Sequence, residues 1–157
     1  MYLVVVAALM FVLPVACIAG ELVLESAPFS LVVVGKWFVI WCVGARLLLA
    51  GLRQILQPRY TAQVILSLKS DESLILVREL GFANVAFGLL GLGSAVYPSW
   101  RLPAALAGGV FYGLAGANHV LQAHRSRLEN VAMFSDLWAA VVLLAGFVVM
   151  LGNRNPS

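Results

Sequence analysis

The sequence predicts an all-α integral membrane protein, a polytopic transmembrane helix bundle with about five spans. Of its 157 residues, 62% are hydrophobic and 11% are charged, whereas a soluble domain averages about 45–50% apolar and about 25% charged residues. A soluble core of this length could not bury so much apolar surface, so the expected solvent is lipid. The composition excludes a soluble enzyme, a disordered chain, a disulfide scaffold and a nucleic-acid module.

Charge-free runs locate four of the spans, and they match the ~30 Å hydrocarbon core at ~1.5 Å per residue. The remaining span is strongly apolar but contains Lys36 and Arg46. Lys36 lies near one end and can snorkel, whereas Arg46 lies deeper and needs a partner. We expect one membrane domain, with a four-span core and an added N-terminal helix. In chain order the spans are 2–20, 30–52, 77–97, 103–123 and 137–153.

The first span is expected to be retained as a helix rather than removed as a signal peptide. It has no positively charged N-terminal region, and the sequence VACIAG is a poor cleavage site. Pro14 predicts a kink in this helix.

The distribution of basic residues predicts an N-terminus inside and a C-terminus outside the cell. Five spans place the termini on opposite sides of the membrane, and cytoplasmic loops carry the excess of Lys and Arg. The expected inner loops carry Arg53, Arg59, Lys69, Arg125 and Arg127, against Arg101 and Arg154 on the outer side.

Two segments between spans have helical patterns. In the interfacial segment 58–70, Thr61 is predicted to cap a short helix that runs to Leu68 along the cytoplasmic interface. The second segment, 124–135, is amphipathic and is predicted to extend the fourth span.

Small residues recur at helical spacing on the third and fourth spans. Gly88 and Gly91 share one face of the third, and Gly109 and Gly113 share one face of the fourth. Small residues at this spacing let helices approach closely in lipid, so we expect these glycines to be packing positions.

Polar residues gather on the inner half of the predicted bundle. A charge at the membrane centre costs roughly 2.5–3.5 kcal/mol on insertion scales, so Arg46 should face the interior and pair with a carboxylate. Glu79 is the first expected partner, because it lies at a similar depth, and Asp136 is the next. The whole cluster comprises Arg46, Arg53, Arg78, Glu79, Asn84, Tyr112, Asn118, His119, Glu129, Asn130 and Asp136.

Four interpretations of this cluster remain open. It can be a buried network that locks the helices, or a pocket open to the cytoplasmic side for a small anionic or carbonyl-bearing ligand such as a quinone head group. It can also be a proton or ion path through Glu79 and His119. A metal site would use His119, His124, Glu129 and Asp136, but the two histidines are five residues apart and do not share a helix face. The sequence requires no metal and no cofactor.

Four sequence blocks resemble a family of small bacterial integral membrane proteins with no assigned activity. They are GKWFVIWCVGARLLLAGLRQI, RELGFANVAFGLLGL, PAALAGGVFYGLAGANH and ENVAMFSD. Residues 44–92 bear a fainter resemblance to the DoxX-like proteins, some of which are small subunits associated with quinol oxidation. The DoxX-like proteins carry an R/E-L-G-G-like turn on one helix. The corresponding segment here is ELGF (79–82), so Phe82 stands in place of the second glycine. The resemblance implies a multi-pass protein of the bacterial inner membrane.

The sequence therefore favours a binding or accessory membrane protein that presents the polar cluster to a ligand or a partner complex. The alternative is a small transporter or a proton- or ion-conducting protein, although neither inverted repeats nor broken helices are evident. An enzyme ranks third, because no nucleophile or electrophile trap is visible. The expected partners are the lipid bilayer and further subunits, as a homo-oligomer or a membrane complex, and not nucleic acid.

Overall fold

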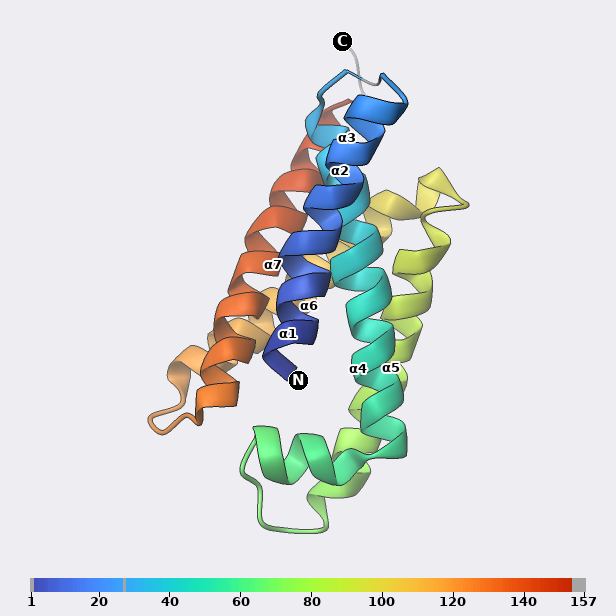
Figure 1. Ribbon diagram of the computed structural model, residues 1–157. Coiled ribbons are helices and arrows are strands. Elements are labelled where there is room, and N and C mark those ends of the chain that lie inside the picture. The colour runs from blue at the N-terminus through green and yellow to red at the C-terminus, as the bar shows by residue number, and fades with distance from the viewer. Residues whose placement is uncertain (1, 27, 154–157) are drawn as a thin grey trace.

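The computed structural model describes residues 2–26 and 28–153, and this part of the chain folds into helices without strands (Figure 1). Five helical segments are long and apolar enough to cross a membrane. They are Tyr2–Leu24, Leu31–Leu56, Ser73–Gly93, Pro98–Leu121 and Arg127–Gly152. The prediction of an all-α bundle with five spans is confirmed.

The first two spans each contain a π-helical turn. The first is α1 (Tyr2–Ala7), η1 (Ala8–Val12) and α2 (Leu13–Leu24), and the second is α3 (Leu31–Phe38), η2 (Val39–Ala45) and α4 (Arg46–Leu56). The others are α5 (Ser73–Gly93), α6 (Arg101–Leu121) after the 3₁₀ turn η4 (Pro98–Trp100), and α7 (Arg127–Gly152). The helical type changes just before Pro14, where the ring removes a backbone donor.

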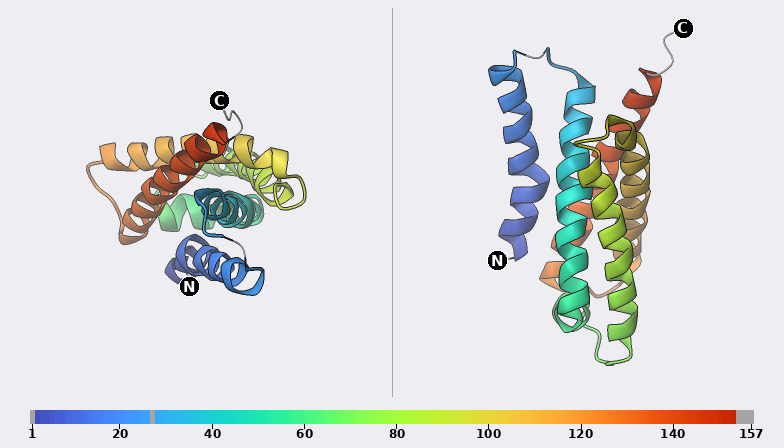
Figure 2. Two further views of the ribbon diagram at one scale, coloured as in Figure 1. Left: turned by 90° about the horizontal axis from the view of Figure 1, so that it is seen from above. Right: turned by 90° about the vertical axis from the view of Figure 1, so that its right-hand side faces the viewer.

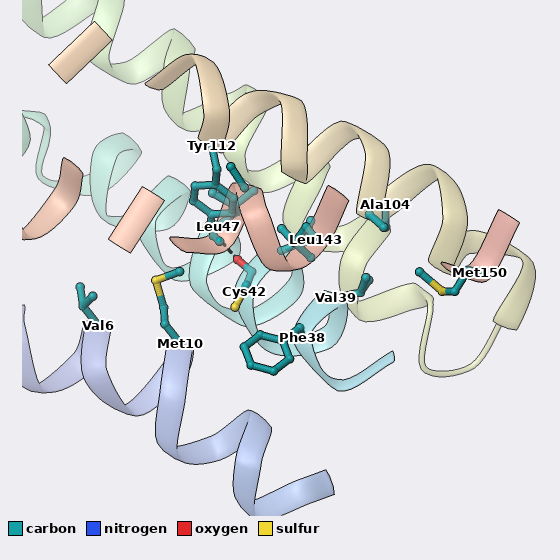
Figure 3. Close-up of a cluster of buried hydrophobic side chains, with 14 residues drawn as sticks. Val6, Met10, Phe38, Val39, Cys42, Leu47, Ala104, Tyr112, Leu143 and Met150 are labelled. Carbon is teal, nitrogen blue, oxygen red and sulfur yellow. Dashed lines mark hydrogen bonds between the residues drawn. The ribbon is translucent and has the colours of Figure 1, made fainter. Parts of the chain in front are cut away.

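The bundle is layered when viewed along its axis (Figure 2, left). The N-terminal span lies on one outer side, α3 and α4 form the middle, and α5, α6 and α7 cover the far side. The core joins these layers, because Val6 and Met10 of the first span pack with Phe38, Cys42 and Leu143 (Figure 3). The N-terminal span thus lies on the outside of the bundle and still contributes side chains to the shared core.

The start of α1 and the end of α7 lie at opposite ends of the bundle, as an odd number of crossings requires (Figure 1). The orientation of the two ends across a membrane stays a prediction. Arg154, which we counted among the outer charges, lies outside the described residues.

Helix α7 begins at Arg127, ten residues before the predicted start at 137. Ser126 caps it, since its Oγ accepts the Glu129 N–H at 3.1 Å while the Glu129 carboxylate accepts the Ser126 N–H at 2.9 Å. This reciprocal capping box separates α7 from α6. The prediction that 124–135 extends the fourth span is therefore wrong.

The segment after Pro58 forms a short helix that lies across one end of the bundle (Figure 1). Its π-helical part is η3 (Tyr60–Ile65), so it ends before the predicted Leu68. Thr61 is buried inside this turn and caps nothing, which corrects its predicted role.

Candidate functional site

Arg46 is held inside the bundle by α7. Its Nη2 donates to Asp136 Oδ1 at 2.8 Å and to Ser135 Oγ at 3.0 Å, and both charged side chains are about nine-tenths buried. Its guanidinium also lies 4.8 Å from the centroid of the Tyr112 ring. A carboxylate therefore neutralises Arg46 within the bundle, but the carboxylate is that of Asp136.

The expected pairing of Arg46 with Glu79 is wrong, because Glu79 is exposed on α5. The reason lies two residues further along the helix. Gly81 is buried against α4, where an added Cβ would lie 3.0 Å from Gly51 O. Residues two apart in a helix point to roughly opposite faces, so Gly81 turns Glu79 outward.

Tyr112 connects this ion pair to the π-helical turn η2. Its hydroxyl donates to the backbone carbonyl of Cys42 at 2.5 Å (Figure 3). A π-helical turn interrupts the regular i→i−4 pattern of the helix. The buried Tyr112 thus orients its ring under Arg46 and gives a buried carbonyl a partner.

Next to the ion pair lies a cavity of about 260 Å³, which we call the polar pocket. Its walls come from α1, η1, α4, η3, α5, α6 and α7. The crosswise η3 contributes Tyr60 and Thr61, and much of the remaining wall is aliphatic. Its principal polar lining residues are Arg46, Arg53, Gln54, Asn84, Tyr112, His119 and Asp136.

Four buried side-chain nitrogen or oxygen atoms in the described part of the chain have no hydrogen-bond partner. All four belong to residues that line the polar pocket. They are Arg46 Nη1, Arg53 Nε, Asn84 Oδ1 and His119 Nδ1. Buried polar groups in folded proteins are nearly always paired, so four unpaired groups around one cavity require an explanation.

The other contacts of these residues hold them in place. The amide nitrogen of Asn84 donates to Gln54 Oε1 at 2.7 Å, and the guanidinium carbon of Arg53 lies 3.6 Å from the Tyr60 ring centroid. Sequence reasoning misses Gln54, although it includes the adjacent Arg53, and the helix that carries both residues runs to Leu56 rather than to the predicted 52.

The remaining members of the predicted cluster lie elsewhere. Arg78, Glu79 and Asn118 are exposed. Glu129 belongs to the capping box of α7, and Asn130 accepts a hydrogen bond from Arg125 at 3.1 Å. Inclusion of these five residues in one cluster is corrected, since the polar pocket brings together only Arg46, Arg53, Asn84, Tyr112, His119 and Asp136.

The predicted metal and proton-path sites also separate in space. No group of three His, Cys, Asp or Glu side chains within residues 2–26 and 28–153 is arranged to hold a metal ion. Glu79 lies outside the polar pocket that His119 lines.

Three of the four predicted packing glycines lie at close helix contacts. A Cβ on Gly88 would lie 2.5 Å from Leu48 N, Gly91 abuts the backbone of Gly44, and a Cβ on Gly109 would lie 2.8 Å from the Leu144 side chain. Gly113 also faces α7, but the space there does not require glycine. A Cβ there would meet Ala140 Cβ at an ordinary 3.6 Å.

A family of unknown function (DUF6790) matches residues 4–155, and the chain belongs to that family. No curated protein and no solved structure matches the chain. Membership confirms the prediction of an uncharacterised family, and the residues of the polar pocket lie within the matched range except Tyr2.

Proposed function

Starting from membership of this family, we propose that the chain is a multi-pass membrane protein that binds a small molecule in the polar pocket. The observation that carries the proposal is that the four residues with an unpaired buried side-chain atom all line one cavity. Leaving such a group unpaired costs about 1–3 kcal/mol. A bound molecule that pairs with these groups would offset that cost.

The unpaired groups favour a ligand with a hydrogen-bond acceptor in its head group. Arg46 Nη1 and Arg53 Nε can only donate. His119 Nδ1 donates or accepts according to its tautomer, and rotating both amides of the Gln54–Asn84 pair would turn the Asn84 NH₂ toward the cavity. Carboxylates and quinone carbonyls both supply suitable acceptors.

The size of the cavity suits a head group. At about 260 Å³ it falls just below the ~300–1,000 Å³ of sites that enclose a drug-sized ligand. It is also large enough for several waters at ~30 Å³ each, so the experiment must separate a ligand from water.

The proposal also covers the side of the membrane that the polar pocket faces, the membrane itself and the assembly of the protein. The excess of Lys and Arg at the predicted inner side supports placing the polar pocket toward the cytoplasm. The family resemblance supports a bacterial inner membrane and a role as an accessory subunit or a homo-oligomer.

Native mass spectrometry in mild detergent tests the proposal. The protein should carry a small-molecule adduct that is released on activation and identified by its mass. Ala115→Phe places a bulky ring in the polar pocket, whereas Ala117→Phe places the same ring on an exposed position of α6.

The adduct should persist in Ala117→Phe and disappear in Ala115→Phe. If the wild-type protein carries no adduct, or if Ala115→Phe retains it fully, the polar pocket is not the binding site.

A further inference from the structure

The polar pocket has one more positive than negative side chain. Its lining contains Arg46, Arg53 and Asp136, with no further Lys, Arg, Asp or Glu. Asp136 is paired with Arg46. None of the three ion pairs between described residues includes Arg53, whose guanidinium stacks on Tyr60 instead. Counted over Lys, Arg, Asp and Glu, the lining carries a net charge of +1, which one anionic group would balance.

The apolar wall of the polar pocket reaches the outer surface of the bundle. Val5 on α1, Leu49 on α4 and Leu80 on α5 line the cavity, yet they are 41%, 50% and 37% exposed. These residues lie on helices that can cross a membrane, so their exposed sides meet lipid chains. A molecule with an acyl chain can therefore place its head in the cavity while its chain remains in the bilayer.

Building on the proposed binding function, we infer that the polar pocket selects a monoanionic, single-chain amphiphile of the fatty-acid class. The carboxylate pairs with the guanidinium of Arg53 through a charge-assisted hydrogen bond. The chain runs along Val5, Leu49 and Leu80 toward the lipid. A cavity of about 260 Å³ admits one head group and the start of one chain.

Photocrosslinking in phosphatidylcholine nanodiscs tests this inference. The probes are a diazirine-labelled hexadecanoic acid and the matched hexadecanol, which has the same chain but no charge. Crosslinked positions are located by peptide mass spectrometry. The acid should label peptides that contain residues of the polar pocket about tenfold more than the alcohol does, since 1.4 kcal/mol corresponds to tenfold.

Variants of Arg53 connect the labelling to this side chain. Arg53→Gln should reduce acid labelling about tenfold without changing alcohol labelling, and Arg53→Lys should restore part of it, because it keeps the charge. Arg59→Gln is the matched control. It removes the same charge from an exposed side chain six residues away, and should label like the wild type.

Equal labelling by acid and alcohol in the wild type, or unchanged acid labelling in Arg53→Gln, would overturn selection for an anion. If the alcohol labels these peptides as strongly as the acid, the proposed binding function survives and only the charge preference is lost. If no probe labels these peptides and no native adduct is found, both the proposed binding function and the selection for an anion are refuted.

Discussion

The two faces of helix α4 are packed in opposite ways. On the side toward α5, the second span meets α5 along a glycine seam. The seam is formed by Gly44 of η2, Gly51 of α4, and Gly81, Gly88 and Gly91 of α5. At this seam a Cβ on Gly51 would lie 2.6 Å from Gly81 O. On another face of α4, Arg46 and Arg53 border the polar pocket, a cavity of about 260 Å³ with unpaired polar atoms. The face toward α5 has no room for an added methyl group, whereas the face toward the polar pocket borders an unfilled cavity.

This contrast separates stability from binding. In lipid, helices associate mainly through close van der Waals packing and weak polar contacts, and the glycine seam provides both a short distance and a continuous contact. A cavity and unpaired polar groups lower stability in any solvent. The residues that carry the unpaired groups come from α4, α5 and α6 and surround one cavity, which is why we propose that this region binds a ligand.

Breaking the ion pair between Arg46 and Asp136 should lower the stability of the protein more than any other change considered below. Arg46→Ala leaves Asp136 buried and uncompensated, so stability should fall by about 3–5 kcal/mol in denaturant titrations in detergent. Arg46→Leu combined with Asp136→Leu should recover most of that loss but not ligand binding.

Glu79→Ala is the control for this pair. Glu79 is exposed, so its removal should change stability by less than about 0.5 kcal/mol. Little loss for Arg46→Ala, or a loss for Glu79→Ala as large as that for Arg46→Ala, would contradict the pairing of Arg46 with Asp136.

A methyl group in the glycine seam should have the next largest effect. Gly88→Ala places a Cβ 2.5 Å from Leu48 N, which is backbone and cannot turn aside, so we expect a loss of about 1–3 kcal/mol. Gly113→Ala, where the nearest atom lies 3.6 Å away, should be neutral or stabilising by up to about 1 kcal/mol. Equal thermal stability of the two variants would show that the seam is not tight.

Removing the hydroxyl of Tyr112 should have a smaller effect. Tyr112→Phe keeps the ring under Arg46 but leaves the Cys42 carbonyl without this donor, so stability should fall by about 1 kcal/mol. Thermal unfolding of the variant beside the wild type measures the loss. A variant as stable as the wild type would mean that another donor replaces the hydroxyl.

Replacing the amide pair in the polar pocket should have the smallest effect on stability. Gln54→Leu with Asn84→Leu removes a hydrogen bond together with an unpaired oxygen, and exchanging both partners for apolar groups is nearly neutral. The same variant should lose the adduct in native mass spectrometry. A strongly destabilised double variant would assign these amides to the framework of the bundle instead.

The spans could be predicted because hydropathy alone separates them, and the need of Arg46 for a carboxylate followed from its depth. Which carboxylate it meets depends on the rotation of α5, and that rotation is set by contacts of Gly81 and Gly88 with α4. Periodicity within one helix does not contain this information.

For two other errors, the start of α7 and the omission of Gln54, the sequence contained the information needed for a correct prediction. Ser126 and Glu129 form an S-x-x-E sequence that marks a helix start, and it gives the boundary of α7. Gln54 adjoins Arg53, which the predicted cluster already includes, so its place at this end of the second span could also be read from the sequence. The cavity itself arises from five spans and the crosswise η3, so no local pattern predicts it.

The most direct test is an experimental density map of the protein purified with its native lipids. The account predicts continuous, elongated density in the polar pocket, within hydrogen-bond distance of the Arg53 guanidinium and extending past Leu49 toward the bilayer. A pocket that contains only separate water peaks bonded to Arg46, Asn84 and His119, or one closed by these side chains, would contradict the account.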